Sequence, residues 1–125
     1  MNIHESAEDY LEKILMLQEQ KGAVRSIDIA VAMGYSKPSV SVAMKNLREN
    51  GYISVDGDGF IHLEAPGLAI ARRIYDRHRK LTAFFVALGV DPDTAAHDAC
   101  KIEHDLSDET YQKMIAFAEK QAQTP

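Results

Sequence analysis

Residues 26–63 read SIDIAVAMGYSKPSVSVAMKNLRENGYISVDGDGFIHL, and this stretch decides the fold. Ser26 is suited to cap a short helix over residues 27–33, which Gly34 would end, because serine side chains accept hydrogen bonds from free amides at helix starts. Ser36 is placed to cap a second helix, with Pro38 in the first turn, where proline is tolerated. Apolar residues at helical spacing give this second helix a buried face. The stretch therefore begins as a helix, a tight turn and a helix.

The sequence period changes after Asn50-Gly51, which ends the second helix. Residues 52–55 and 60–63 are short runs rich in β-branched and aromatic side chains, as in strands. Asp56-Gly57-Asp58-Gly59 between them is a hairpin turn signal. Two helices followed by a hairpin predict a winged helix-turn-helix.

Helical segments flank this stretch on both sides. Before it, a helix is expected to start at Ser6 as N-cap, with Asp9 as a box-like partner, and to end at Lys21-Gly22. After it, the pattern predicts helices over residues 66–88, 92–104 and 108–118, with Ser107 as the N-cap of the last one. The chain is thus expected to be mainly α: a winged-helix domain over residues 1–64 and a helical domain over residues 65–125.

The second helix of the quoted stretch carries small polar and basic residues that suit contact with DNA. Short side chains at its start approach phosphates and base edges closely, and cations hold the DNA backbone. The net charge is −5, but residues 22–55 hold four basic and two acidic residues, so a locally basic face remains. The alternative is a small helical domain with a solvated polar face. The candidate DNA-binding residues are Arg25, Ser36, Lys37, Pro38, Ser39, Ser41, Lys45 and Arg48.

Residues typical of a transition-metal site occur on both sides of this module. The segment 97–104 reads HDACKIEH, in which His97, Cys100 and His104 would form one stripe of a helix with Glu103 on its edge. Imidazole, thiolate and carboxylate together suit a transition metal. The candidate metal ligands are Asp9, Glu12, His78, His97, Cys100, Glu103 and His104.

Each of these residues also has an ordinary interpretation. His78 lies in Arg77-His78-Arg79-Lys80, which reads equally as a plain basic face. A single cysteine such as Cys100 is often only a small buried hydrophobe. Asp9 would also complement the dipole at a helix start. Ligands on both sides of a DNA-binding module nevertheless suggest metal-controlled DNA binding.

The chain resembles the metal-dependent repressors of the diphtheria toxin repressor family, including the manganese-transport-regulator branch. The resemblance covers nearly the whole chain and rests on Ala7–Glu12 (AEDYLE), Ser36–Ser41 (SKPSVS), Arg77-His78-Arg79 and Ile102–Ser107 (IEHDLS). It implies a winged helix joined to a helical dimerisation domain, and a bound Fe(II) or Mn(II) ion. Larger members carry an additional SH3-like domain, which we do not expect here.

The resemblance also assigns the ligands residue by residue. Asp9 and Glu12 match the manganese-type ligands, whereas iron-type proteins have methionine at the position of Asp9. Cys100 matches the iron type, in place of a manganese-type glutamate. His97 matches a histidine of an iron-type second site, which leaves room for two ions per subunit, although the glutamate expected near Thr82 is absent. The ligands shared by both branches are His78, Glu103 and His104.

The sequence therefore predicts a metal-responsive repressor of metal-uptake genes that binds palindromic duplex DNA as a homodimer. Dimerisation is expected to use apolar residues that could equally form an internal core: Leu81, Phe84, Phe85, Met114 and Phe117. Two alternatives are a winged-helix regulator that senses a small molecule and, from another class, a small metallohydrolase. The N-terminus lacks a signal-peptide pattern, no apolar run is long enough to span a membrane, and a single cysteine excludes an internal disulfide, so we expect a cytoplasmic protein.

Overall fold

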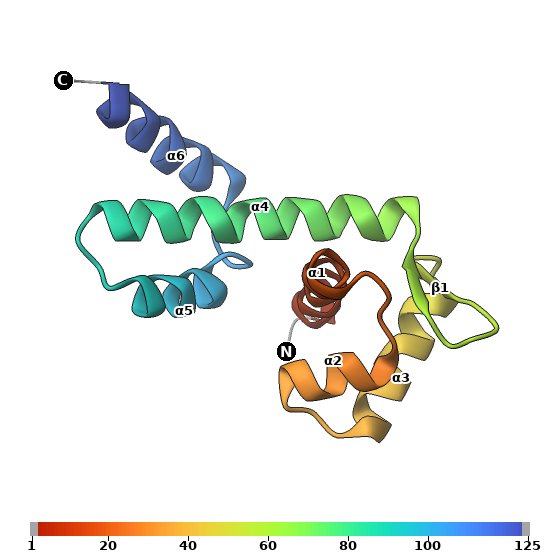
Figure 1. The fold of residues 1–125 in the computed structure, drawn as a ribbon. Helices are drawn as coiled ribbons and strands as arrows, with labels where there is room; N and C mark the ends of the chain where they lie inside the picture. The colour runs from red at the N-terminus through yellow and green to blue at the C-terminus, as the bar shows by residue number, and fades with distance from the viewer. Residues whose placement is uncertain (1–2, 124–125) are drawn as a thin grey trace. The chain divides into compact units, whose positions relative to one another are not determined.

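The computed structural model describes residues 3–123, and the fold is mainly helical with one small hairpin (Figure 1). The elements in chain order are α1 (Ile3–Lys21), α2 (Ser26–Met33), α3 (Lys37–Glu49), β1 (Ile53–Val55), β2 (Ile61–Leu63), α4 (Ala65–Ala87), α5 (Pro92–Ile102) and α6 (Asp108–Gln123). This order confirms the expected winged helix followed by a helical domain. Within residues 3–123, no helix is long and apolar enough to cross a membrane.

The described residues fall into two compact units that divide between Tyr75 and Asp76. The division lies within α4, because Ile70 and Ala71 of this helix pack into the core of the first unit, whereas Leu81 and Phe85 pack into the second. The first unit contains the winged helix, and the second contains α5 and α6.

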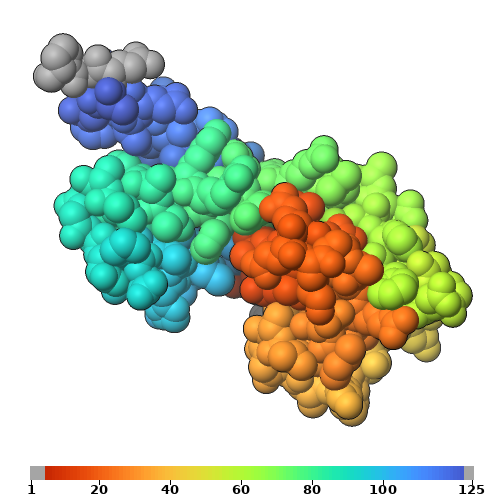
Figure 2. Space-filling model, viewed as in Figure 1, coloured from red at the N-terminus to blue at the C-terminus, as the bar shows by residue number. Residues whose placement is uncertain are grey.

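The core of the first unit is built from one apolar face of each helix. Leu11 and Ile14 of α1, Ile29 of α2 and Val40 of α3 are fully buried together with Ile61 of the hairpin. The space-filling view shows the side chains of α1 lying directly against the first turns of α4 (Figure 2). This packing fixes α3 with its polar side outward.

The hairpin pairs β1 with β2 antiparallel, with Ser54 opposite His62. Its turn is closed by Asp56, whose Oδ1 accepts hydrogen bonds from the amides of Asp58 and Phe60 at 2.9 and 3.0 Å. The amide of Ile61 donates to the carbonyl of Val24 at 2.8 Å, which ties the hairpin to the loop before α2. The expected strands were each one residue too long, since Tyr52 and Phe60 lie outside the ladder.

Most helix boundaries follow the expected local signals, but one end of each of α1, α2, α5 and α6 differs. The N-cap expected at Ser6 is wrong: α1 already includes Ile3, and no glycine or proline precedes Ser6 to interrupt it. Arg25, not Ser26, is the N-cap of α2, and its amide donates to Asp28 Oδ2 at 2.8 Å. The last helix extends to Gln123 rather than ending at residue 118. The caps at Ser36 and Ser107 are confirmed by hydrogen bonds from the amides of Ser39 and Thr110.

Gly67 lies in the first turn of α4, where this helix passes closest to the hairpin. A Cβ atom on Gly67 would overlap the carbonyl oxygen of Tyr52 and lie 3.3 Å from Leu11 Cδ2. The same Tyr52 carbonyl accepts a hydrogen bond from the amide of Glu64 at 3.0 Å. A glycine is therefore required for α4 to dock against the end of the wing, and this requirement comes from residues distant in sequence.

Candidate metal centre and nucleic-acid interface

The outer face of α3 combines cations with a small polar residue. Lys37, Ser41, Lys45 and Arg48 are exposed and recur every three or four residues, so they share one side of the helix. Val40, Met44 and Leu47 are buried and anchor the helix from inside. A protruding helix with this polar side has the form of a recognition helix for the major groove of DNA.

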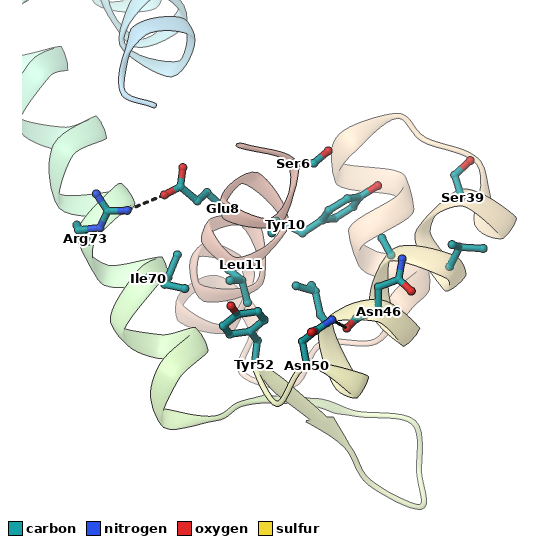
Figure 3. Close-up of a pocket in the computed structure, with 14 residues that line it drawn as sticks. Ser6, Glu8, Tyr10, Leu11, Ser39, Asn46, Asn50, Tyr52, Ile70 and Arg73 are labelled. Carbon is teal, nitrogen blue, oxygen red and sulfur yellow. Dashed lines mark hydrogen bonds and ion pairs between the residues drawn. The ribbon is translucent and has the colours of Figure 1, made fainter. Parts of the chain in front are cut away.

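The start of α3 separates the candidate serines. Ser36 caps the helix, and its hydroxyl also lies 2.8 Å from the hydroxyl of Ser39. Ser39 lines a pocket on the flank of α3 that faces α1, whereas Ser41 shares the side of Lys37 and Lys45 (Figure 3). Pro38 is exposed in the first turn.

Arg25 lies beside the wing rather than on α3. Its guanidinium carbon is 4.4 Å from the ring centre of Phe60, so the cation stacks on the residue that follows the hairpin turn. Nearby, Lys21 donates to Asp28 at 2.6 Å. This hydrogen bond, followed by the one from the Arg25 amide, lowers the pKa of Asp28. The amide of Arg25 thus bonds to Asp28, whereas the side chain of Arg25 contacts the wing.

His62 is an exposed polar residue of the wing that the sequence analysis missed. Its Nε2 lies 2.8 Å from Asp56 Oδ2, and the hydrogen bond between them is the largest cause of a lowered pKa at Asp56. The strand alternation could have identified it, because Ile61 is buried and the next side chain must face the opposite side of the ribbon. The wing therefore presents an imidazole to solvent.

A pocket of about 680 Å³ lies within the first unit, between α1, α3 and the first half of α4 (Figure 3). Its walls are largely apolar, and the amides of Asn46 and Asn50 stand on the α3 side. Where α4 meets α1 at the pocket, Arg73 donates a hydrogen bond of 2.6 Å to the carboxylate of Glu8. The pocket borders the flank of α3 that does not carry Lys37 and Lys45.

Two candidate metal ligands belong to the first unit. Asp9 and Glu12 are three residues apart on α1, so their carboxylates lie on neighbouring turns of the same face. Glu12 is only 6% exposed, whereas Asp9 is half-buried. Both carboxylates remain candidate ligands, and Glu12 is the more buried of the two.

Three candidate ligands meet in the second unit. His78 Nδ1 of α4 lies 3.0 Å from Glu103 Oε2, and His104 Nε2 lies 3.5 Å from Glu103 Oε1. Glu103 is 0% exposed, and its Oε1 accepts no hydrogen bond from the described residues. Two imidazoles thus flank a fully buried carboxylate that has an unsatisfied oxygen. This donor set fits Fe(II) or Mn(II), both of which accept nitrogen and oxygen ligands.

The helix expected to continue to His104 instead ends at Ile102. Glu103 is the C-cap and His104 lies in the following turn, so the expectation of one helical stripe over residues 97–104 is wrong. The turn allows Glu103 to point inward, toward α4. His97 and Cys100 remain on α5 and are both exposed, so the interpretation of Cys100 as a buried core residue is also wrong.

The five candidate dimerisation residues separate into two groups. Leu81 is fully buried in the core of the second unit, with Phe85 and Met114 packed against that core. Phe117 is 58% exposed, and the side chains of Val86 and Leu88 are exposed as well. Phe84 is half-buried and contacts the ring of Phe85 at a centroid distance of 5.9 Å.

Comparison with known proteins assigns both parts of the chain. Residues 2–60 match the family model of the N-terminal DNA-binding domain of iron-dependent repressors, and residues 65–125 match that of their metal-binding and dimerisation domain. An uncharacterised HTH-type transcriptional regulator of Methanocaldococcus jannaschii is 35% identical over 118 residues, covering 93% of this chain and 94% of the relative. The transcriptional regulator MntR of Escherichia coli is 34% identical, covering 93% of this chain and 75% of the relative.

Solved structures show the same fold. A manganese-dependent transcriptional repressor in complex with manganese is 30% identical with a TM-score of 0.80, and the match covers 88% of this chain and 51% of that one. The IdeR protein of T. acidophilum is 25% identical with the same TM-score, covering 90% and 53%. The chain thus spans about half the length of these solved proteins. Its family consists of DNA-binding regulators that use Fe(II) or Mn(II), which sets the metallohydrolase alternative aside. The chain belongs to the iron-dependent repressor family and is a metal-dependent, dimerising DNA-binding transcriptional regulator, not an enzyme.

Proposed function

We propose that this protein represses metal-uptake genes in the cytoplasm by binding a palindromic operator when Fe(II) or Mn(II) is bound. The ligands proposed are Asp9 and Glu12 from the first unit, and His78, Cys100, Glu103 and His104 from the second. The single observation that carries this proposal is Glu103: a fully buried carboxylate flanked by two imidazoles, with one oxygen left without a hydrogen bond.

The side chains explain why metal would act as a switch. Asp9, Glu12 and Glu103 are three carboxylates of like charge, so holding them together without a cation is unfavourable. A bound ion would supply the compensating positive charge. Because the proposed ligands come from both units, their joint coordination would restrict how the winged helix is oriented on the helical domain. Metal and DNA would then favour the same arrangement, which is thermodynamic coupling between two sites.

The operator follows from the symmetry of a dimer. Two copies of α3 related by a two-fold axis read two half-sites that are inverted repeats of each other. The polar side of α3 at Lys37, Ser41 and Lys45 would enter the major groove, and Arg25 would lie beside the wing against the DNA backbone. Restricting the orientation of each winged helix would set the spacing of the two α3 helices.

The donor set is mixed with respect to metal choice. Asp9, Glu12 and Glu103 are hard oxygen ligands that suit Mn(II), whereas the thiolate of Cys100 suits Fe(II) better. We propose that the centre accepts both ions, with a modest preference for Fe(II). The exposed His97, three residues before Cys100 on α5, would serve a second ion.

The test is a gel shift with palindromic duplex DNA under anaerobic conditions, with Mn(II), with Fe(II) and with EDTA. Wild-type protein should bind more tightly with either metal, and Glu103→Gln should bind as weakly with metal as with EDTA. Glu109→Gln is the matched control, because Glu109 is an exposed carboxylate in the first turn of α6. Equal affinity of the wild type with metal and with EDTA would refute the proposed switch.

A second candidate function is regulation by a small organic molecule, which the pocket beside α3 favours. Its volume of about 680 Å³ lies within the range of small-molecule sites, roughly 300–1,000 Å³. Native mass spectrometry of the protein purified from cells in EDTA tests this alternative. A stoichiometric organic ligand, together with DNA binding that does not change with metal, would favour it over the metal switch.

A further inference from the structure

Arg77 is a buried cation that the sequence presented as part of a plain basic face. Only 4% of this residue is exposed, although its neighbours Arg79 and Lys80 on α4 face solvent. Burying a guanidinium is costly unless its N–H groups find partners. The positions of these partners therefore identify the segment that Arg77 stabilises.

The partners of Arg77 are the two ends of one short turn. Its Nη1 donates to the carbonyl of Glu103 at 3.0 Å and to the carbonyl of Leu106 at 3.0 Å. Its Nη2 pairs with the carboxylate of Asp108, the first residue of α6. The guanidinium also lies over the ring of Tyr111, 4.7 Å from its centre. One side chain of α4 thus fixes the chain from the end of α5 to the start of α6.

This turn carries two of the proposed metal ligands, Glu103 and His104. The carbonyl of Glu103 is held by Arg77, and the carboxylate of Glu103 faces His78, the next residue of α4. Two consecutive residues of one helix therefore fix both the backbone and the side chain of Glu103. The carbonyl at the C-cap of a helix has no partner within the helix, so without Arg77 the backbone would be free to reorient.

We infer that Arg77 is a positioning residue of the metal centre: it clamps the turn of residues 103–107 so that the carboxylate of Glu103 lies between His78 and His104. The inference rests on the proposed metal centre and deepens it. An arginine suits the task because its planar fork reaches two carbonyls and a carboxylate at once, whereas a lysine offers one compact ammonium. Groups that orient metal ligands typically change metal affinity by about 10–100-fold when they are replaced.

The variant that tests the inference is Arg77→Lys, which keeps the charge and most of the stem but loses the fork. Mn(II) affinity measured by calorimetry should fall at least about tenfold. The visible spectrum of the Co(II)-loaded protein, which reports on ligand geometry, should change as well. Arg72→Lys is the matched control, because Arg72 is an exposed arginine of the same helix. It should leave both the affinity and the spectrum unchanged.

A double-mutant cycle separates positioning from general destabilisation. If Arg77 acts through the turn that carries Glu103 and His104, the effect of Arg77→Lys should shrink to about threefold or less in a His104→Gln background, which keeps Glu103 for residual metal binding, because coupled residues are non-additive. A purely structural role would weaken metal binding equally in both backgrounds, and that result would overturn the inference. Thermal unfolding in EDTA checks that each variant is folded.

Three further outcomes are decisive. If Arg77→Lys does not fold, Asp108→Asn carries the test, since it removes the charged partner of the fork and leaves both carbonyls in place. It should weaken Mn(II) binding about two- to fivefold, a smaller loss than that expected for removing the orienting group itself, and unchanged binding would overturn the inference.

Lost binding in Glu103→Gln with unchanged binding in Arg77→Lys would overturn the role of Arg77 alone. Unchanged binding in both would overturn the proposed centre itself.

Discussion

Replacing Gly67 by alanine tests the close approach of α4 to the wing. The added Cβ would overlap the carbonyl oxygen of Tyr52 and lie 3.3 Å from Leu11 Cδ2. The principal obstacle is a backbone oxygen, which also accepts a hydrogen bond from the amide of Glu64. No side-chain rotation can therefore relieve the overlap. The first turn of α4 or the end of the wing must move instead.

The magnitude follows from two opposing effects. Overpacking a core by a methyl group costs about 1–3 kcal/mol, and an obstacle of backbone atoms places Gly67→Ala near the upper end. Alanine also favours a helix over glycine by about 1 kcal/mol. The net expected loss is about 2 kcal/mol. For a chain of 125 residues that unfolds as one unit, this corresponds to a melting temperature lower by about 8 °C.

The assay is thermal unfolding followed by circular dichroism in EDTA. All samples are compared at one protein concentration, because dimerisation makes stability depend on concentration. Gly57→Ala is the matched control: Gly57 has open space around its Cβ position and needs no left-handed backbone. It should change stability by less than about 0.5 kcal/mol. A Gly67→Ala protein as stable as the wild type would refute the argument from close packing.

Three more predictions concern the DNA surface, the thiolate and the wing. Lys37→Ala and Arg48→Ala should each weaken DNA binding and reduce the salt slope by about one, with unchanged Mn(II) affinity by calorimetry; lost metal affinity with unchanged DNA binding would contradict our assignment of α3. Cys100→Glu should shift preference toward Mn(II) in anaerobic competition with Fe(II), because a carboxylate is harder than a thiolate; an unchanged ratio would mean that Cys100 is not a ligand. Hydrogen bonds from His62 and from backbone amides lower the pKa of Asp56, so they should stabilise the turn at pH values above the ordinary carboxyl pKa. This stabilisation should be lost as the pH falls through the lowered pKa of Asp56. In carbon-13 NMR titrations, His62→Gln should raise the pKa of Asp56, and an unchanged midpoint would exclude His62 as the main cause.

Local signals in the sequence were sufficient for the order of the helices and the hairpin. Four features show this: the caps at Ser36 and Ser107, the left-handed glycine at Gly34 and the turn at Asp56. Each of them involves only residues within four positions of its own site. Their geometry is set by short-range hydrogen bonds and backbone sterics, so neighbouring residues suffice to predict it. The sequence also proposed the candidate site residues, with the family resemblance supplying their roles, and those roles stay predictions.

The remaining features depend on residues that are distant in sequence. Arg77 looked like a surface cation, but the carbonyls that bury it are 26 and 29 residues away. The need for glycine at position 67 comes from Tyr52 and Leu11, which no local pattern connects to it. The exposure of Cys100 depends on which face of α5 packs against its neighbours. Burial and close approach are properties of packed surfaces, so only the tertiary structure decided them, whereas the helices and turns were already determined by the sequence.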